Sequence, residues 1–275
     1  MPVGVGDDAS TAERRAAGLR YEQSGDGGDL VLLHGFGGCL EHWDPVVGKL
    51  GAERRVIAVD LPGFGRSEAW GRGRRFSIGQ LVDRVERFLD AVGLAAPAVA
   101  GNSLGGVVAL ELAQRRRASS VTVLSPAAFI DGASKLYVAG VLGGLQSITR
   151  VLPGPLVNAA LSVPPVRRSV GGFLVRRPHD LDPVVLRSSA HSIRRGPSLL
   201  LHALGLNYSF RPDDDLDVPV TVAWGTHDRV LWARQVRTAR RVLPEATLIP
   251  LPGCGHVPMS DDPELVAQVL LDGSA

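Results

Sequence analysis

The sequence predicts an α/β fold: a mostly parallel central sheet with helices on both faces and a helical insertion. Short apolar runs alternate along the chain with longer segments of helical periodicity. Continuous apolar runs, unlike alternating ones, are typical of strands that are covered on both faces, as in a parallel sheet. One long internal segment contains no convincing strand. The 275 residues, of which 45% are apolar, are enough for one large domain that carries an insertion.

Six buried strands and four helices are expected in the sheet domain. Strands that alternate with helices along a chain favour parallel pairing, with the helices on both faces of the sheet. The predicted strands are residues 30–33, 56–59, 98–100, 121–124, 218–224 and 247–251. The predicted helices are residues 78–92, 104–116, 229–243 and 263–271.

The insertion is expected over residues 129–212. Proline repeatedly interrupts Leu-, Val- and Arg-rich stretches there, and each proline removes an amide donor and tends to end a helix. We therefore expect several short helices that lie as a cap on top of the sheet. The α/β core then comprises residues 18–128 and 213–275. Residues 1–17 show no clear period and are predicted to be a disordered tail.

Charge and composition exclude several classes of partner. The formal net charge is only +2, and the arginine triplet at 115–117 ends a predicted helix, where cations complement the helix dipole. We therefore expect no nucleic-acid partner. No stretch approaches the roughly 20 apolar residues of a membrane span, and residues 1–20 lack the apolar core of a secretory signal. We expect a cytoplasmic protein without a bound metal, since no cluster has metal-ligand spacing.

A glycine-flanked serine is the strongest chemical signal. Residues 101–106 (GNSLGG) follow one predicted strand directly and open a predicted helix. A serine at such a turn has a strained backbone and an exposed hydroxyl, and side chains at the flanking glycines would collide with neighbouring backbone. The helix N-terminus behind the serine favours negative charge that develops in a reaction. We predict that Ser103 is a nucleophile.

A second glycine-rich segment, residues 34–38 (HGFGG), follows the first buried strand. Glycines let the backbone approach a ligand closely. The amides of Phe36 and Leu104 are predicted to form an oxyanion hole, in which each preset donor stabilises the reaction by roughly 3–4 kcal/mol. Neither this segment nor residues 63–65 complete a dinucleotide fingerprint, so no cofactor is expected.

A serine needs a base, and the base needs a group that orients it. His256 lies in a glycine-flanked loop (GCGHVP) after the last predicted strand. Asp228 ends another predicted strand in the sequence WGTHD, where loops converge over the sheet edge. We predict that His256 is the general base and Asp228 the acid, in the order Ser, Asp, His.

Together these segments resemble the α/β-hydrolase superfamily, in its capped branch of esterases and related hydrolases. Five segments carry the resemblance: the oxyanion segment, the turn after the next strand, the nucleophile elbow, the acid loop and the base loop. They are residues 34–38, 60–67, 101–106, 225–228 and 255–256. The resemblance runs from about residue 19 to the C-terminus except for the cap. It implies the α/β-hydrolase fold and a serine hydrolase.

Other polar side chains compete for these roles. The resemblance implies a structural role for His34 and makes Asp60 a turn residue. His227 adjoins Asp228, but the side chains of neighbouring residues point apart, which disfavours His227 as the base. Cys39 and Cys254 are expected to be inert small side chains, although a redox pair there stays an alternative.

Four residues near the glycine segments are candidates for the substrate pocket. Gly35 and Asn102 adjoin the predicted oxyanion hole and nucleophile. His42 and Trp43 follow the glycine loop, and a place on a helix surface is an equally good expectation for His42.

The favoured function is hydrolysis of a small to medium hydrophobic carboxylic ester through an acyl-enzyme. One alternative is a hydrolase of carbon–carbon bonds in ring-fission products, because GNS at 101–103 is similar to the nucleophile segment of such enzymes. Against this alternative, the segment after His256 lacks the tryptophan that is usual in them. Another is a biosynthetic thioesterase, lactonase or cyclase. The non-enzyme alternative is a ligand-binding receptor, and the intact serine, aspartate and histidine argue against it.

Overall fold

The central feature is one eight-stranded sheet with the order β1-β2-β4-β3-β5-β6-β7-β8. The computed structural model describes residues 14–71, 76–179, 181–197, 208–213 and 216–274. The strands are β1 (Arg14–Ala16), β2 (Leu19–Ser24), β3 (Gly28–Leu33), β4 (Arg54–Val59), β5 (Ala98–Asn102), β6 (Ser120–Leu124), β7 (Val220–Gly225) and β8 (Thr247–Leu251). Strand β2 pairs antiparallel with β1 and β4, and all other pairs are parallel. The predicted fold class is confirmed.

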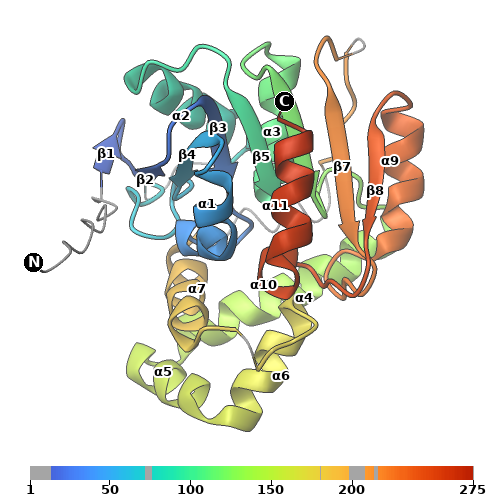
Figure 1. The fold of residues 1–275 in the computed structure, drawn as a ribbon. Coiled ribbons are helices and arrows are strands. Elements are labelled where there is room, and N and C mark those ends of the chain that lie inside the picture. Colours follow the sequence, from blue (N-terminus) through green and yellow to red (C-terminus); the bar gives the residue numbers. More distant parts are fainter. Residues whose placement is uncertain (1–13, 72–75, 180, 198–207, 214–215, 275) are drawn as a thin grey trace, which may run out of the picture.

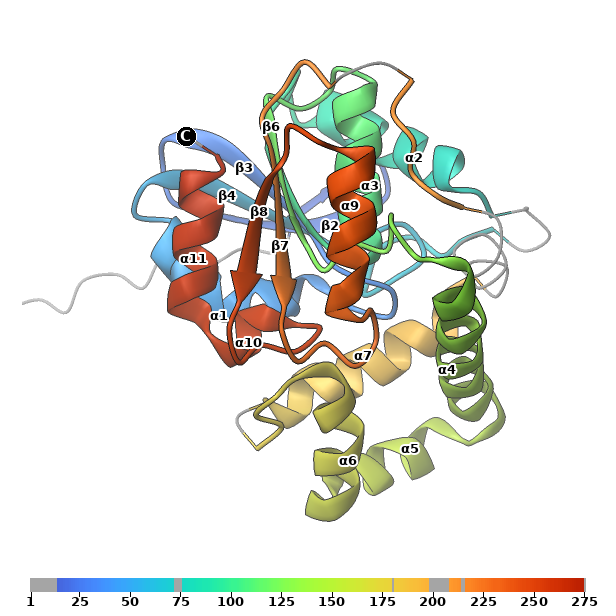
Figure 2. The same cartoon turned by 90° about the vertical axis from the view of Figure 1, so that its right-hand side faces the viewer.

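Helices cover both faces of the sheet (Figures 1 and 2). On one face lie α1 (Asp44–Leu50), which follows a 3-10 turn (Leu40–Trp43), and α11 (Pro263–Asp272), which follows α10 (Pro258–Asp261). On the other face lie α2 (Ile78–Ala91), α3 (Leu104–Gln114) and α9 (Val236–Val242).

Alternate residues of the central strands pack in two separate cores, one on each face of the sheet. Val31 and Leu33 of β3 pack in the core with α2 and α3, whereas Leu30 and Leu32 pack in the core with α1 and α11. Since successive side chains of a strand point to opposite faces, a strand buried on both faces must be apolar throughout. This accounts for the continuous apolar runs in the sequence.

Four further helices lie between β6 and β7 in the chain: α4 (Gly132–Val151), α5 (Gly154–Ser162), α6 (Pro164–Leu174) and α7 (Pro183–Arg195). They form a layer beyond the carboxyl ends of β7 and β8, whose arrowheads point toward it in Figure 2. Proline opens α6 and α7, where its missing amide hydrogen is not needed by the helix. Part of the predicted cap, residues 198–207, lies outside the described residues.

Three details of the sequence-based picture need correction. Residues 14–16 of the predicted tail form β1, and residues 1–13 lie outside the described residues. Strand β2 was missed because it carries charged residues and lies half-buried near the sheet edge, so it has no apolar run. The helix predicted over 229–243 reaches only from Val236 to Val242, after a short 3-10 turn.

Among the described residues, no helix combines the length and the apolar character that a bilayer crossing requires.

Candidate active site

Ser103 sits at the junction of β5 and α3 with a left-handed backbone, φ 54° and ψ −108°. Such angles are strained for a residue with a side chain and persist only where the surroundings enforce them. Two main-chain hydrogen bonds do so here. The Ser103 amide donates to the Leu124 carbonyl oxygen at 3.0 Å, and the Ser103 carbonyl oxygen accepts from the Ala127 amide at 3.0 Å. The turn therefore holds the serine in one orientation at the carboxyl edge of the sheet.

Glycine is required on both sides of this turn. A Cβ atom at Gly101 would overlap the main chain of Gly105, and one at Gly105 would overlap the carbonyl group of Leu33. A Cβ at Gly106 would lie 2.9 Å from the Cβ of Pro126. The close approach of β5, α3 and β3 thus depends on the glycines that the sequence places there.

His256 and Asp228 are joined directly: Nδ1 of His256 donates to Oδ2 of Asp228 at 2.8 Å. The other carboxylate oxygen of Asp228, Oδ1, accepts from the amides of Val230 and Leu231, both at 2.8 Å. The carboxylate is therefore fixed in orientation, and in a neutral His256 ring the one proton lies on Nδ1.

The loop that carries His256 is tied to three other parts of the chain. The main-chain carbonyl oxygen of His256 accepts from the side-chain amide of Asn102 at 2.9 Å, and the same amide group also donates to the Leu124 oxygen at 3.0 Å. The His256 main-chain amide donates to the oxygen of Leu174, at the end of α6, at 2.7 Å. Asp261 accepts from the amide of Gly255 at 2.7 Å. The loop position is thus set from the sheet, from the helical layer and from α10.

Asp261 also holds the chain after α6. Its carboxylate accepts from the amides of Arg176 and Arg177 at 2.8 and 2.9 Å. Because it is buried, with 4% of its surface exposed, these bonds are protected from water. Asp261 therefore links the helical layer to the His256 loop, and nothing local in the sequence signals this role.

Residues 34–38, the glycine loop, lie against residues 101–106, the serine turn. A Cβ atom at Gly35 would lie 3.1 Å from the Cβ of Ser103, which is closer than an ordinary van der Waals contact, so glycine favours this approach. Within the described chain, neither the Phe36 amide nor the Leu104 amide donates a hydrogen bond to another protein group. Phe36 packs edge-on against Phe64, with ring centroids 5.5 Å apart. Two unused amides thus flank Ser103.

Ser103, His256, Gly35, Phe36 and Asn102 line one pocket of about 60 Å³ between the sheet and the helical layer. Its other walls are mainly apolar and come from the loop after β6, the loop after β7, and α4 and α7. These apolar wall residues include Ile130, Val138, Leu142, Leu145, Ile193 and Val230. A cavity of this volume holds only a few water molecules.

His42 lines this pocket, and Trp43 does not. Nε2 of His42 donates to Oγ of Ser189 on α7 at 2.8 Å, and that hydroxyl donates in turn to the Val185 oxygen. Burial lowers the pKa of His42 to about 3, so the ring is neutral at ordinary pH. The prediction that Trp43 borders the pocket is wrong: the ring turns to the opposite side and packs in the core with α1, beside Val46.

Helix α7 is fastened over the glycine loop by Ser192. Its hydroxyl donates to the Gly38 oxygen at 2.7 Å and accepts from the Gly65 amide at 2.9 Å. A Cβ atom at Gly37 would overlap Ile193 of α7, so glycine is needed where the helix and the loop meet. Sequence reasoning missed Ser189 and Ser192, because each acts on residues far away in the chain.

The rival residues lie outside this arrangement. Both ring nitrogens of buried His34 are occupied: Nδ1 donates to the Gly35 oxygen and Nε2 accepts from the Leu61 amide. Asp60 accepts from the amides of Leu40 and Arg66 and thereby organises two turns. The structural roles expected for His34 and Asp60 are confirmed.

His227 is exposed, its ring contacts the hydroxyl of Thr226, and it does not line the pocket. Cys39 and Cys254 are buried free thiols. Burial raises the pKa of Cys254 to about 12 and that of Cys39 well above its usual value, so both stay protonated and unreactive at neutral pH.

Comparison with known proteins shows the family of the chain. Residues 30–269 match the alpha/beta hydrolase family. The chain belongs to this family. The α/β-hydrolase chain is 31% identical over 260 residues to the dihydrolipoyllysine-residue acetyltransferase component of the acetoin cleaving system of Pseudomonas putida; the match covers 91% of this chain but only 65% of that protein.

Two further similarities cover almost the whole chain. A pimeloyl-[acyl-carrier protein] methyl ester esterase of Sodalis glossinidius is 30% identical over 271 residues, which is 93% of this chain and 97% of that protein. The solved structure of a thermophilic esterase from Thermogutta terrifontis superposes with a TM-score of 0.69 at 23% identity, over 92% of each chain. The family model thus covers most of the chain, and the solved structure shares its fold.

Proposed function

We propose that this α/β-hydrolase is a serine esterase, with Ser103 as nucleophile, His256 as general base and Asp228 as the acid. The hydrogen bond from Nδ1 of His256 to Asp228 supports the proposal most strongly, because it leaves Nε2 free to accept a proton in the pocket that Ser103 lines. The esterase among the relatives that this chain matches over nearly its full length adds support.

The mechanism follows from these positions. As the Ser103 hydroxyl attacks the acyl carbon, His256 accepts its proton, and Asp228 stabilises the imidazolium that forms. The amides of Phe36 and Leu104 stabilise the negative oxygen of the tetrahedral intermediate. The protonated histidine then gives its proton to the departing alcohol, which leaves an acyl-enzyme. Water, deprotonated by the same histidine, releases the acid and restores the serine.

A small to medium hydrophobic ester fits the pocket best. Its walls are mainly aliphatic, and the neutral His42 adds a polar but uncharged group. The volume of about 60 Å³ favours a short acyl chain unless the helical layer moves. In this proposal α4–α7 form the cap, and the contacts of Ser189 and Ser192 hold it closed over the glycine loop.

A panel of p-nitrophenyl esters with increasing acyl length tests the proposal. The wild type is expected to hydrolyse the short esters best, and Ser103→Ala to fall to the uncatalysed rate. Absence of turnover with every ester would contradict the proposal and direct attention to the receptor alternative.

The same panel is run with a thioester, a lactone and a vinylogous diketone. Loss of visible absorbance with the diketone, at a higher kcat/KM than for any ester, would assign carbon–carbon hydrolysis instead. The side-chain amide of Asn102, which suggested that chemistry, binds two main-chain oxygens, so the fold alone accounts for this residue.

A further inference from the structure

The exposed apolar side chains of this protein are concentrated in the helical layer. Among the described residues, every large aliphatic or aromatic side chain in the exposed class belongs to α4–α7 or the turns between them. They are Leu136, Ile148, Val151, Leu152, Leu156, Val163, Val166 and Val184. Val151 is 81% exposed and Ile148 57%. Scattered surface leucines are ordinary, but confinement of all of them to one part of the molecule marks an interaction surface.

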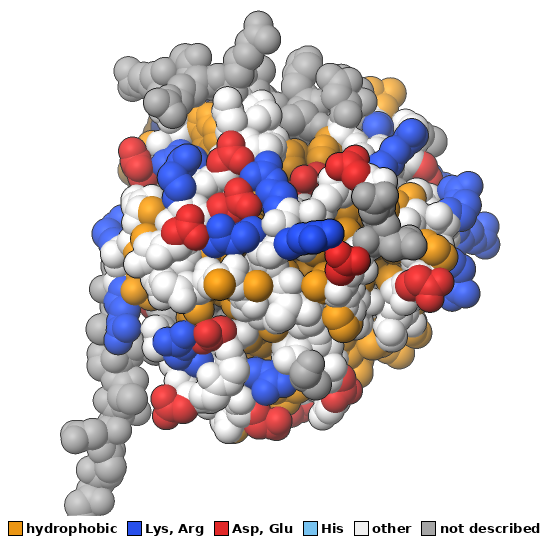
Figure 3. Space-filling view, turned by 90° about the horizontal axis from the view of Figure 1, so that it is seen from above, with side chains coloured by type: hydrophobic (Ala, Val, Ile, Leu, Met, Phe, Trp, Pro, Cys, Tyr) orange, Lys and Arg blue, Asp and Glu red, His pale blue; other side chains and the backbone are white. Residues whose placement is uncertain are grey.

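Most of these residues lie where the chain turns from α4 through α5 into α6. We call the surface formed by Ile148, Val151, Leu152, Leu156, Val163 and Val166 the distal surface. Figures 1 and 2 show α5 and α6 at the end of the molecule farthest from the sheet. The opposite end, seen in Figure 3, differs in character: Lys and Arg side chains alternate there with Asp and Glu.

The charge around the distal surface is of one sign. Residues 132–179 contain six Lys or Arg residues and no Asp or Glu, although the whole chain has 30 basic and 28 acidic residues. Arg168 on α6 is exposed, and within the described residues it makes no hydrogen bond or ion pair with another side chain. The helical layer is therefore both apolar and cationic at its far end.

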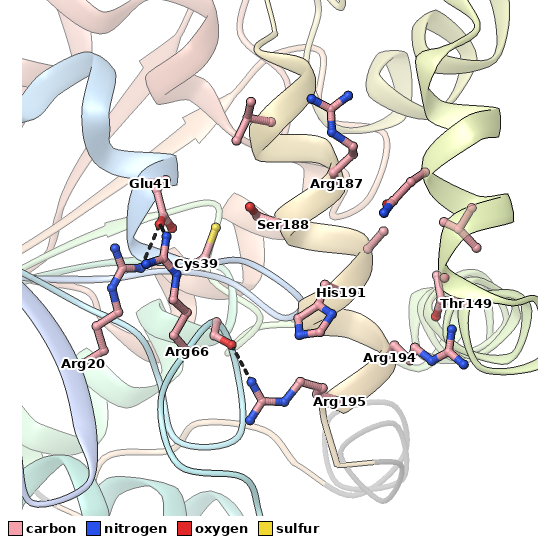
Figure 4. A pocket seen from close by; sticks show the side chains of 16 residues that line it. Arg20, Cys39, Glu41, Arg66, Thr149, Arg187, Ser188, His191, Arg194 and Arg195 are labelled. Carbon is pink, nitrogen blue, oxygen red and sulfur yellow. Dashed lines mark hydrogen bonds and ion pairs between the residues drawn. The ribbon is translucent and has the colours of Figure 1, made fainter. Parts of the chain in front are cut away.

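More cations lie beside it. A hollow of about 1020 Å³ borders α5 and α7 on the side away from Ser103. Figure 4 shows Arg187, Arg194 and Arg195 along the face of α7 that borders this hollow, beside His191, whose pKa is lowered by burial and by the two neighbouring arginines. Arg195 donates to the Gly65 oxygen, and Arg194 to the Leu152 oxygen at the edge of the distal surface. Cationic groups thus continue from the distal surface into this hollow.

We propose that the distal surface docks on a membrane surface that carries anionic lipids. Exposed aliphatic side chains on a cationic helical segment are the combination that lies in the interface of such a membrane, with the apolar side chains among the acyl chains and the arginines beside the headgroups. The attachment is peripheral, through the ends of helices. The inference does not rest on the proposed esterase activity, because it uses none of the residues of the pocket.

Charge decides between a membrane and a second copy of this chain. A symmetric dimer through the distal surface would bring the same patch of both copies together. The arginines of 150–168 would then face one another, and no carboxylate of residues 132–179 is available to pair with them. An anionic lipid surface supplies the missing negative charge.

Sedimentation of the whole protein with lipid vesicles tests the proposal. We expect the wild type to partition onto vesicles of phosphatidylcholine mixed with phosphatidylglycerol, more weakly onto phosphatidylcholine alone, and more weakly in high salt. The double variant Val151→Asp, Leu156→Asp is expected to lower the partition coefficient at least about tenfold, since it places charge where apolar groups enter the interface. Arg168→Glu is expected to lower it about fivefold or more.

Two controls separate docking from other effects. Arg240→Glu, an exposed arginine on α9, reverses the same charge in the sheet domain and is expected to leave partitioning nearly unchanged. Hydrolysis of a soluble ester and the melting temperature are expected to stay at wild-type values in the Val151, Leu156 and Arg168 variants. The proposal is overturned if the wild type ignores anionic vesicles or if the double variant partitions as well as the wild type. It is also overturned if sedimentation velocity shows a dimer that the double variant abolishes.

Discussion

The side chain of Asn102 joins the serine turn to the histidine loop: its amide donates to the main-chain oxygen of His256 at 2.9 Å. The residue before the nucleophile therefore sets the position of the residue proposed to activate it. The second bond of the same amide, to the Leu124 oxygen, anchors this connection to the end of β6. One buried side chain thus connects the ends of β5 and β6 to the loop that carries His256.

Replacing Asn102 by alanine is expected to lower kcat on the order of tenfold to a hundredfold, because the His256 loop loses its tie to the serine turn and small misplacements are costly. The buried His256 oxygen loses this partner and the Leu124 oxygen keeps only the Ser103 amide, so the free energy of unfolding is expected to fall by about 1–3 kcal/mol. Steady-state kinetics and urea denaturation measure the two effects. Asn158→Ala on the exposed face of α5 is the matched control, and equal kinetics in both variants would show that the tie is irrelevant to the reaction.

Asp228→Asn is expected to lower kcat on the order of 10³–10⁴-fold while the protein stays folded. The amide oxygen of asparagine can still accept from Val230 and Leu231, which turns its NH₂ group toward His256. Nδ1 must then accept rather than donate, so the proton moves to Nε2 and the ring can no longer act as a base. Asp217→Asn, which removes an exposed ion pair with Arg116, is expected to be neutral. Retention of more than a tenth of wild-type activity by Asp228→Asn would count against the role of Asp228.

The sheet and the site loops were predictable because their signals are local. Strands β3 to β8 are apolar runs in sequence, and the positions of Ser103, Asp228 and His256 follow from short patterns at strand ends. The glycine at 101 is required by contact with the nearby backbone of Gly105, whereas the glycine at 105 is required by contact with Leu33 of β3.

The contacts between the helical layer and the sheet were not predictable. Ser192 binds Gly38 and Gly65, and Asp261 binds the amides of Arg176 and Arg177, over separations that leave no periodic signal in the chain. The 3-10 turn directs His42 toward Ser189 of α7 and Trp43 into the core beside α1, and no local pattern in the sequence shows which of the two faces the pocket.

Substitution of glycine by alanine is expected to change the free energy of unfolding in opposite directions at positions 105 and 144. Gly105→Ala is expected to lower the free energy of unfolding by more than about 2 kcal/mol, because its Cβ overlaps the carbonyl group of Leu33. Gly144→Ala in α4 meets no atom within 4 Å and is expected to raise the free energy of unfolding by about 0.5–1 kcal/mol, since alanine is the better helix former. Chemical denaturation measures both, and a stable, active Gly105→Ala variant would show that the turn is less tightly packed than described.

Burial of His42 makes stability depend on pH in the acid range. Its pKa falls from 6.5 to about 3 on folding, so the unfolded chain binds the proton first, and stability present above pH 6.5 is lost as the pH falls below it. From pH 7 to pH 5 this single group is expected to lower the free energy of unfolding by about 2 kcal/mol. Urea denaturation of His42→Gln at both pH values checks this, since the free energy of unfolding of the variant should fall correspondingly less between pH 7 and pH 5. Equal losses in the two proteins would mean that the ring is protonated as easily in the folded state.

Covalent labelling with a fluorophosphonate, followed by mass spectrometry of the peptides, tests the central claim most directly. A single adduct is expected on Ser103, with no adduct in Ser103→Ala and a strongly slowed reaction in His256→Ala, whose base is missing. An unlabelled wild type, or labelling of Ser103→Ala at the wild-type rate, would contradict the assignment of Ser103 as the nucleophile.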